Sequence, residues 1–198
     1  MLALFFTIFE VLILKPFYLL MDFYIKTGKD KYAEVIHGSQ LTHKQKLEIY
    51  DFRISQYKNK QTYLIPKNDE ERSQELSIDE KSFHALAYDN KNELIAVSRF
   101  TTYPFEVTSI LGKEKTANFK NYLEISRLVC KKKNSGVGKR VLIKAGLWAI
   151  RSKEFDGFIA ICKKQNSSIF KKFGLNIIEE FKYTKRESEN YDFISANF

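Results

Sequence analysis

Residues 124–142 read EISRLVCKKKNSGVGKRVL, an apolar strand joined to a helix by a basic loop that Gly136 and Gly138 interrupt. Glycine lets the backbone bend close to a ligand, and the first free N–H groups of a helix carry the positive end of its dipole. The stretch therefore predicts an anion site that suits a pyrophosphate. Its spelling from Lys133, K-x-x-G-x-G-K, is neither a nucleotide P-loop nor G-x-G-x-x-G.

The segments that follow the glycine loop continue an alternation of helices and strands. A helix over about residues 137–152 leads to a strand from Gly157 to Cys162, and a short helix from Ser167 to Phe173 is closed by Gly174. This order resembles the GNAT acyltransferase superfamily, whose loop reads Q/R-x-x-G-x-G/A and whose later helix reads N-x-x-x-x-Y-x-x-x-G-F. The resemblance implies an N-acyltransferase.

The resemblance also implies the donor site. The donor would be acyl-CoA or the acyl-phosphopantetheine of an acyl carrier protein, with no metal. Two positions depart from the family pattern: Lys133 replaces the usual Arg or Gln, and Phe170 replaces a Tyr that protonates the departing thiolate. Asn166 matches the family Asn that contacts the pantetheine arm, and it also suits the N-cap of the short helix. The expected donor-binding residues are Leu128, Val129, Lys133, Asn134, Ser135, Gly136, Val137, Gly138, Lys139, Arg140, Asn166 and Phe170.

A narrower resemblance comes from the strand Glu124-Ile-Ser-Arg127-Leu, which is similar to the E-x-S-R-F strand of acyl-homoserine-lactone synthases and long-chain N-acyl amino acid synthases. Residues 49–53 look like the helix end that carries their early Arg, and residues 89–100 look like their hairpin. This likeness implies a medium or long acyl chain and an acceptor pocket shaped by Arg53, Arg99, Ser126 and Arg127. Since Arg binds carboxylates in bidentate geometry, an amino acid is a natural acceptor, although structural ion pairing is equally open for each Arg.

The chemistry needs few side chains. In GNAT relatives the two central strands splay and the pantetheine inserts between them, so that a backbone N–H near Leu128 or Val129 would face the thioester carbonyl. We expect Glu124 to take the amine proton, directly or through a water. Its alternative role is a salt bridge with Arg127 or Arg99.

The remaining pattern predicts an α/β fold, with a mixed, mostly antiparallel sheet flanked by helices. Thr42 caps a helix that starts at His43, whereas the charged residues 67–77 predict an exposed loop. The expected strands cover residues 82–88, 93–103, 122–130, 157–162, 177–184 and 191–198.

The N-terminus is apolar from Met1 to Phe23, and we expect a separate helix over residues 1–26 before an acyltransferase domain over residues 27–198. The uninterrupted apolar part ends at Lys15 and is too short to span about 30 Å of hydrocarbon. Burial against the sheet and peripheral contact with a membrane both suit this composition, and both stay open.

The amino-acid composition limits the kinds of partner that we expect for this protein. The chain has 198 residues, 44% hydrophobic content and a net charge of +9. Lysines and arginines flank the glycine loop, so an acidic acyl carrier protein would suit this face. No aromatic residue interleaves the basic run 131–144, which argues against nucleic acid. An ordinary acetyltransferase acting with acetyl-CoA and a non-catalytic basic binding module remain the alternatives.

Cysteine and histidine usage predicts the compartment. Cys130 and Cys162 are too few for a disulfide framework, and no Cys/His spacing indicates a structural zinc site. We therefore expect core packing for both cysteines in a reducing cytoplasm, at the inner face of the membrane if the N-terminal segment binds lipid. The three histidines lie outside every motif and look incidental.

Overall fold

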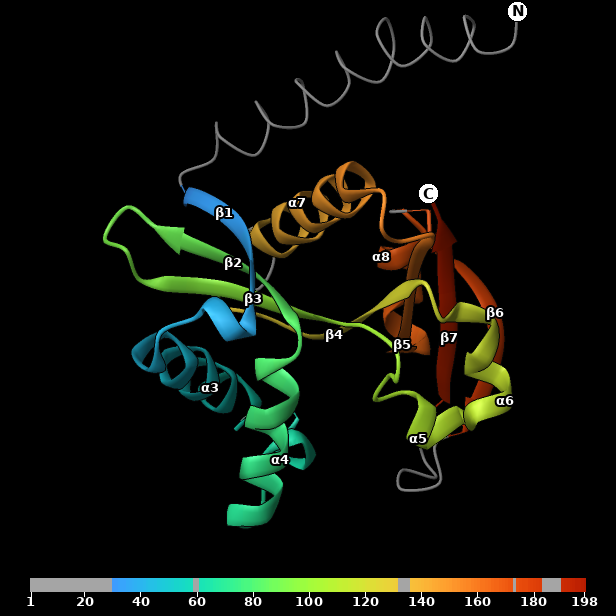
Figure 1. Cartoon of the computed structure of the whole chain (residues 1–198), viewed down its shortest axis with the longest axis horizontal. Coiled ribbons are helices and arrows are strands. Elements are labelled where there is room, and N and C mark those ends of the chain that lie inside the picture. The colour runs from blue at the N-terminus through green and yellow to red at the C-terminus, as the bar shows by residue number, and fades with distance from the viewer. Residues whose placement is uncertain (1–29, 59–60, 132–135, 173, 183–189) are drawn as a thin grey trace, which may run out of the picture.

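A seven-stranded sheet in the order β1-β2-β3-β4-β5-β7-β6 forms the centre of the molecule (Figure 1). The computed structural model describes residues 30–58, 61–131, 136–172, 174–182 and 190–198. Every strand pair is antiparallel except β4 with β5, which is parallel. The mixed, mostly antiparallel sheet is therefore confirmed. The strands are β1 (Asp30–His37), β2 (Phe83–Asp89), β3 (Leu94–Thr101), β4 (Tyr122–Cys130), β5 (Gly157–Lys163), β6 (Asn176–Lys182) and β7 (Asn190–Asn197).

Helices cover both faces of the sheet. On one face, α7 packs its apolar side onto an aliphatic and aromatic core that includes Phe100 and Leu123. On the other face, α3 covers a smaller core, and α5 and α6 lie beside the β5 end of the sheet. The helices are α3 (His43–Tyr57), α4 (Asp69–Glu80), α5 (Thr108–Leu111), α6 (Lys113–Thr116), α7 (Val137–Ser152) and α8 (Ser167–Lys171).

Helix α3 begins where the sequence predicts. The Thr42 hydroxyl accepts a hydrogen bond from the Gln45 N–H at 3.3 Å, and the Gln45 side chain accepts one from the Thr42 N–H at 2.9 Å. This reciprocal capping box satisfies two backbone donors that the first helical turn leaves free.

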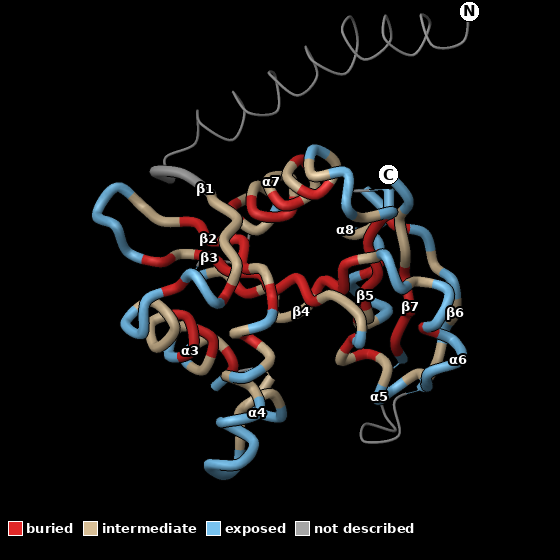
Figure 2. The backbone as a smooth tube through the Cα atoms, viewed as in Figure 1, coloured by how far each residue is buried: buried red, intermediate tan, exposed pale blue. Residues whose placement is uncertain are grey.

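Helix α4 corrects the prediction of an exposed loop over residues 67–77. Asn68 caps the helix by accepting from the Glu71 N–H at 2.9 Å, and three acidic residues in the first turn favour its dipole. The helix lacks apolar periodicity because its inward face carries Glu75 and Asp79, which form ion pairs instead of packing in an apolar core. Figure 2 shows that the rest of α4 is largely exposed. Strand β1 has no counterpart among the predicted strands.

Strands β4 and β5 part halfway along their length. They pair from Tyr122 with Gly157 to Ile125 with Ala160, and beyond that point β4 pairs only with β3 while β5 continues beside β7. A bulge accompanies the parting: between the pairs Arg99 with Ser126 and Val97 with Val129, β4 contains one more residue than β3. Arg127 in this bulge has a φ of 52°, a backbone conformation uncommon outside glycine. The splayed strand pair that the sequence predicts is present.

The apolar helix expected over residues 1–26 lies outside the described residues, as does its membrane contact through Met1 to Phe23. Among the residues that the structure describes, no helix is long and apolar enough to cross a bilayer.

Alanine substitutions at two glycines should change the stability of the protein in opposite directions. A Cβ on Gly157 would lie 2.0 Å from the Ala196 carbonyl oxygen, whereas one on Gly146 inside α7 would meet its nearest atom at 3.8 Å. We expect Gly157→Ala to lower the free energy of unfolding by about 2 kcal/mol or more, because backbone must move. Gly146→Ala should raise it by about 0.5–1 kcal/mol, because alanine favours the helix. Urea denaturation measures both changes, and equal stability of the two variants would contradict the packing described.

Candidate active site

The glycine loop leads into α7 as the sequence predicts. Gly136 is the N-cap residue with a φ of 77°, and its carbonyl accepts the first helical hydrogen bond from the Arg140 N–H at 3.2 Å. A Cβ on Gly138 would lie 2.8 Å from the Cys130 sulfur, so the first turn of α7 packs closely on the end of β4. Val137 is buried below the loop, and Lys139 is exposed. Of the predicted donor-binding residues, Lys133, Asn134 and Ser135 lie outside the described residues.

Leu128 and Val129 lie in the bulged half of β4, next to the opening toward β5. Val129 is buried on the α3 face, and Leu128 packs partly against the core under α7. In this half of β4, the backbone groups that face β5 have no partner strand in the described sheet. The edge of β4 beyond Ile125 is therefore unpaired on its β5 side among the described strands.

Two predicted residues lie in the segment that follows β5 along the chain. Asn166 holds the N-cap position of α8, but its side chain makes no capping hydrogen bond there. Phe170 is partly buried against the core and carries no hydroxyl to act as an acid.

The two cysteines are buried or half-buried thiols. Burial raises the pKa of Cys130 to about 11 and that of Cys162 to about 12, so both stay protonated at neutral pH. Neither cysteine is activated as a nucleophile.

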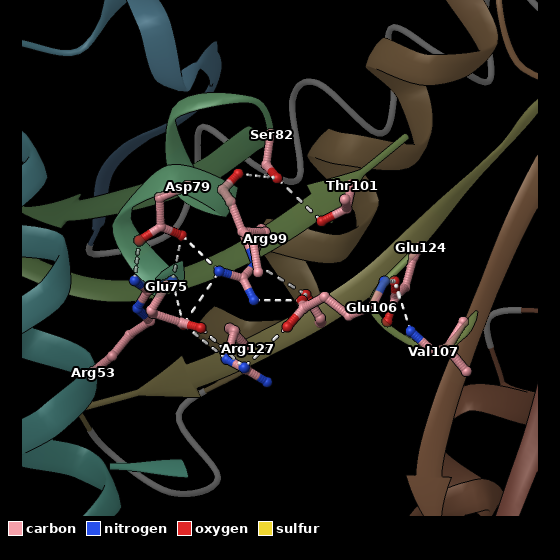
Figure 3. Close-up of polar contacts among 12 residues, drawn as sticks. Arg53, Glu75, Asp79, Ser82, Arg99, Thr101, Glu106, Val107, Glu124 and Arg127 are labelled. Atoms are coloured by element: carbon pink, nitrogen blue, oxygen red, sulfur yellow. Dashed lines mark hydrogen bonds and ion pairs between the residues drawn. The ribbon is translucent and has the colours of Figure 1, made fainter. Parts of the chain in front are cut away.

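A cluster of three arginines and three carboxylates lies between the sheet and the helices α3 and α4 (Figure 3). Arg53 pairs with both oxygens of Asp79, and Arg99 bridges Asp79 at 2.8 Å and Glu75 at 3.1 Å. Arg99 also pairs with Glu106, whose other oxygen accepts from Arg127 at 3.0 Å. We call these six residues the ion-pair cluster: Arg53, Glu75, Asp79, Arg99, Glu106 and Arg127.

Burial differs across the ion-pair cluster. The side chains of Arg53 and Arg99 are 1% and 0% exposed, whereas those of Arg127 and Glu106 are each 19% exposed. Ser126 joins the exposed side, since its hydroxyl donates to Glu106 at 3.1 Å and accepts from Arg99 at 3.3 Å. Of the four residues predicted to shape the acceptor pocket, the structure thus buries Arg53 and Arg99 in ion pairs and leaves Arg127 and Ser126 nearer to solvent.

The pKa of Glu75 shows that the neighbouring arginines stabilise its ionised form. Burial alone would raise it, but Arg127 and Arg99 outweigh that effect and lower the pKa to about 2. Since the ordinary value is 4.5, the stabilisation that ionised Glu75 provides is complete above pH 4.5 and is lost as the pH falls toward 2.

Glu124 lies beside the ion-pair cluster. Its Oε2 accepts hydrogen bonds from the backbone N–H groups of Glu106 at 2.7 Å and Val107 at 3.3 Å. Burial raises the pKa of Glu124 to about 7, and the charge of Glu106 adds to the shift. Among the described residues no salt bridge joins Glu124 to Arg127 or Arg99, so the predicted alternative role is replaced by capping of the 106–107 backbone.

Sequence reasoning missed Glu75, Asp79, Glu106 and Tyr57. The one available signal was the i, i+4 spacing of Glu75 and Asp79, which places two acids on one face of a helix. His84, expected to be incidental, is fully buried with its Nε2 at 2.9 Å from the Asp79 carbonyl oxygen, and burial lowers its pKa to about 4. No group of three metal-ligating side chains occurs within the described part of the chain.

The buried and exposed ion pairs should differ sharply in energy. Arg53→Met leaves Asp79 buried without one of its two arginine partners, and we expect it to lower the free energy of unfolding by about 3–5 kcal/mol. The control Lys115→Met breaks an exposed pair with Glu179 and should cost at most about 1 kcal/mol. Denaturant unfolding of both variants measures the difference, and a cost for Arg53→Met as small as that of the control would show that the cluster does not hold the fold.

Solved structures share this architecture at low sequence identity. Escherichia coli ElaA is 14% identical with a TM-score of 0.60, and the match covers 83% of this chain and 98% of ElaA. An acyl-CoA N-acyltransferase from Pseudomonas aeruginosa is 13% identical with a TM-score of 0.61, covering 83% and 98% of the two chains. A GNAT-family acetyltransferase from Streptococcus pneumoniae is 15% identical with a TM-score of 0.59, covering 84% and 99%.

Sequence comparisons add nothing to this result. No protein-family model matches the chain, and no curated protein matches it significantly. The structural likeness shows the fold, and the chain therefore has the GNAT fold that its sequence predicts.

Proposed function

We propose that this protein is an N-acyltransferase that moves a medium or long acyl chain from the phosphopantetheine thioester of acyl carrier protein or CoA to a small amine such as an amino acid. The observation that carries the proposal is the parting of β4 and β5 beside the N-terminus of α7. The unpaired edge of β4 suits an extended chain that carries amide groups, and the N-terminus of α7 suits a phosphate. The phosphopantetheine arm of CoA or of acyl carrier protein contains both amides and a phosphate.

The donor would lie in the opening as an additional strand. Its phosphate would accept hydrogen bonds from the backbone at Gly136 to Gly138, and its thioester carbonyl would face an N–H near Leu128 or Val129. One such donor contributes about 3 kcal/mol to a transition state. Exposed lysines on both sides of the opening would attract CoA phosphates or an acidic carrier protein, among them Lys131, Lys139, Lys164, Lys171 and Lys172.

The transfer forms a C–N bond and breaks a C–S bond. The amine attacks the thioester carbonyl and loses a proton to Glu124, directly or through a water, and the tetrahedral intermediate expels the thiolate. A pKa of about 7 suits a base at neutral pH. Because Phe170 offers no proton, the sulfur would leave as a thiolate, and a thiolate is a weak enough base to leave without prior protonation.

We propose a long acyl chain because the strand from Glu124 to Leu128 resembles the E-x-S-R-F strand of acyl-homoserine-lactone synthases and long-chain N-acyl amino acid synthases. The same geometry fits an acetyl donor equally well, so acyl length is the part of the proposal that an assay must decide. Ordinary acetylation is the second candidate.

A donor panel tests the function. Purified full-length protein is incubated with an amino acid mixture and with acetyl, octanoyl and palmitoyl donors, each on CoA and on acyl carrier protein, and products are read by mass spectrometry. We expect N-acyl products from the octanoyl or palmitoyl donors. Turnover with acetyl-CoA alone would replace the proposal with an ordinary acetyltransferase, and donor binding without turnover would favour a binding module.

A valine in the glycine loop tests the donor site. Gly136 and Gly112 have φ values of 77° and 88°, and a Cβ on either meets nothing within 4 Å. Gly136→Val and Gly112→Val should therefore share a backbone cost of about 1–2 kcal/mol. Only Gly136→Val should weaken CoA binding, by about tenfold or more in calorimetry. Unchanged binding by that variant would remove the loop from the donor site.

The role of Glu124 predicts a pH dependence. The rate should rise with pH through about 7 as Glu124 loses its proton, and Glu124→Gln should remove this inflection and lower kcat by about 100-fold or more. Ionisation of the acceptor amine affects both proteins alike and serves as the internal control. An inflection that survives in Glu124→Gln would assign the base elsewhere.

Stability gives an independent measure of the same pKa. Since the folded value is raised from 4.5 to about 7, the contribution of protonated Glu124 is present below pH 4.5 and is lost as the pH rises through 7. Glu124→Gln should therefore lose less stability than the parent over that range.

A further inference from the structure

The hydroxyl of Tyr57 is buried and unpartnered. Tyr57 lies in the last turn of α3, is 1% exposed, and packs in the apolar cluster that also contains Val97 and Val129 of the sheet. Within the described residues its hydroxyl oxygen makes no hydrogen bond. Buried hydroxyls are nearly always paired, so this one indicates a polar group that binds beside it.

Charged side chains of the ion-pair cluster act on the Tyr57 hydroxyl. Burial raises the pKa of Tyr57 to about 12, and the charges that act on it most are those of Arg127, Arg53 and Glu75. Geometry agrees, since Tyr57 shares its apolar cluster with Val129, which follows Arg127 by two residues on β4. A neutral hydroxyl at that place is a hydrogen-bond donor toward an anion.

Arg127 already holds a carboxylate there. Its Nε and Nη2 donate to the two oxygens of Glu75 at 2.9 and 3.1 Å, the side-on bidentate geometry in which Arg recognises any carboxylate. This pair lies toward the solvent-accessible edge of the cluster, with Arg127 19% and Glu75 11% exposed. The opposite edge, where Arg53 and Asp79 meet, is closed to solvent.

We propose that Arg127 and Tyr57 form a carboxylate subsite for the acceptor, and that Glu75 occupies this subsite until the acceptor displaces it. The identity of the ligand as an acceptor rests on the proposed function. An incoming amino acid would exchange its carboxylate for that of Glu75 on Arg127 and would also accept the hydrogen bond that Tyr57 offers. Its amine would then lie on the face of β4 that carries Glu124.

The attachment of α4 is compatible with this exchange. Most of the helix is exposed, and Glu75 and Asp79 provide its buried charged contacts with the sheet. Asp79 remains bound to Arg53 and Arg99 when Glu75 is displaced, so α4 keeps one anchor. Arg99, which also contacts Glu75, retains Asp79 and Glu106 as partners.

Matched ligands and variants test the subsite without any donor. Calorimetry on the full-length protein compares glycine and leucine with glycinamide and leucinamide, which differ only in the carboxylate. The parent should bind the acids more tightly than the amides. Tyr57→Phe should raise Kd for the acids about 10- to 100-fold, because one hydrogen bond to a charged group is lost, and should leave the amides unchanged. Glu75→Gln should lower Kd for the acids, because the competing carboxylate is gone.

Folding is controlled separately. Tyr57→Phe removes no hydrogen bond found in the structure, so its melting temperature should equal or exceed that of the parent, and a ligand effect cannot be attributed to unfolding. Tyr50→Phe, on the same helix, is the matched control and should change neither stability nor ligand preference. Equal responses of acids and amides to Tyr57→Phe would overturn the subsite.

The two proposals fail in different ways. Turnover of amines with no preference for a carboxylate would overturn the subsite and leave the acyltransferase intact. Carboxylate binding that depends on Tyr57, together with no turnover on any donor, would support the subsite and overturn the proposed function.

Discussion

The ion-pair cluster holds α4 to α3 and to the sheet. On the other side, α7 buries a continuous apolar stripe, and hydrophobic contact accounts for its position. Helix α4 has no such stripe, so its place depends on Glu75 and Asp79 meeting arginines from α3, β3 and β4. Buried charges at such a junction are balanced three against three, which is the condition under which desolvation is tolerated.

This difference between the two faces also divides their roles. The α7 face is an apolar support that fixes the N-terminus of α7 beside the end of β4. The opposite face places two titratable groups, Glu124 and Arg127, along the same strand. Strand β4 thus joins an unpaired edge to a polar surface on one face, and the proposed acyl transfer between two ligands would use both.

Local signals explain what the sequence could predict. The start of α7 after Gly136, the cap at Thr42 and the strand carrying Glu124 and Arg127 each depend on residues within a few positions, and all three form as expected. The acidic partners of the arginines could not be predicted from the sequence, because Glu75 and Glu106 are 52 and 21 residues away from Arg127 along the chain. The charged pattern of α4 predicts exposure, and only the folded sheet supplies the arginines that bury part of it.

The bulge at Arg127 brings these features together. Before it, Leu123 and Ile125 face the α7 core, and after it Leu128 and Cys130 do, so the extra residue reverses the alternation of the strand. The reversal turns Val129 toward Tyr57 and α3, and it lets Arg127 itself reach Glu75 and Glu106. A regular strand would continue beside β5 and close the opening. An unfavourable φ and a partly buried charge are kept at one residue, and such local conflicts with folding rules concentrate where a protein binds its ligands.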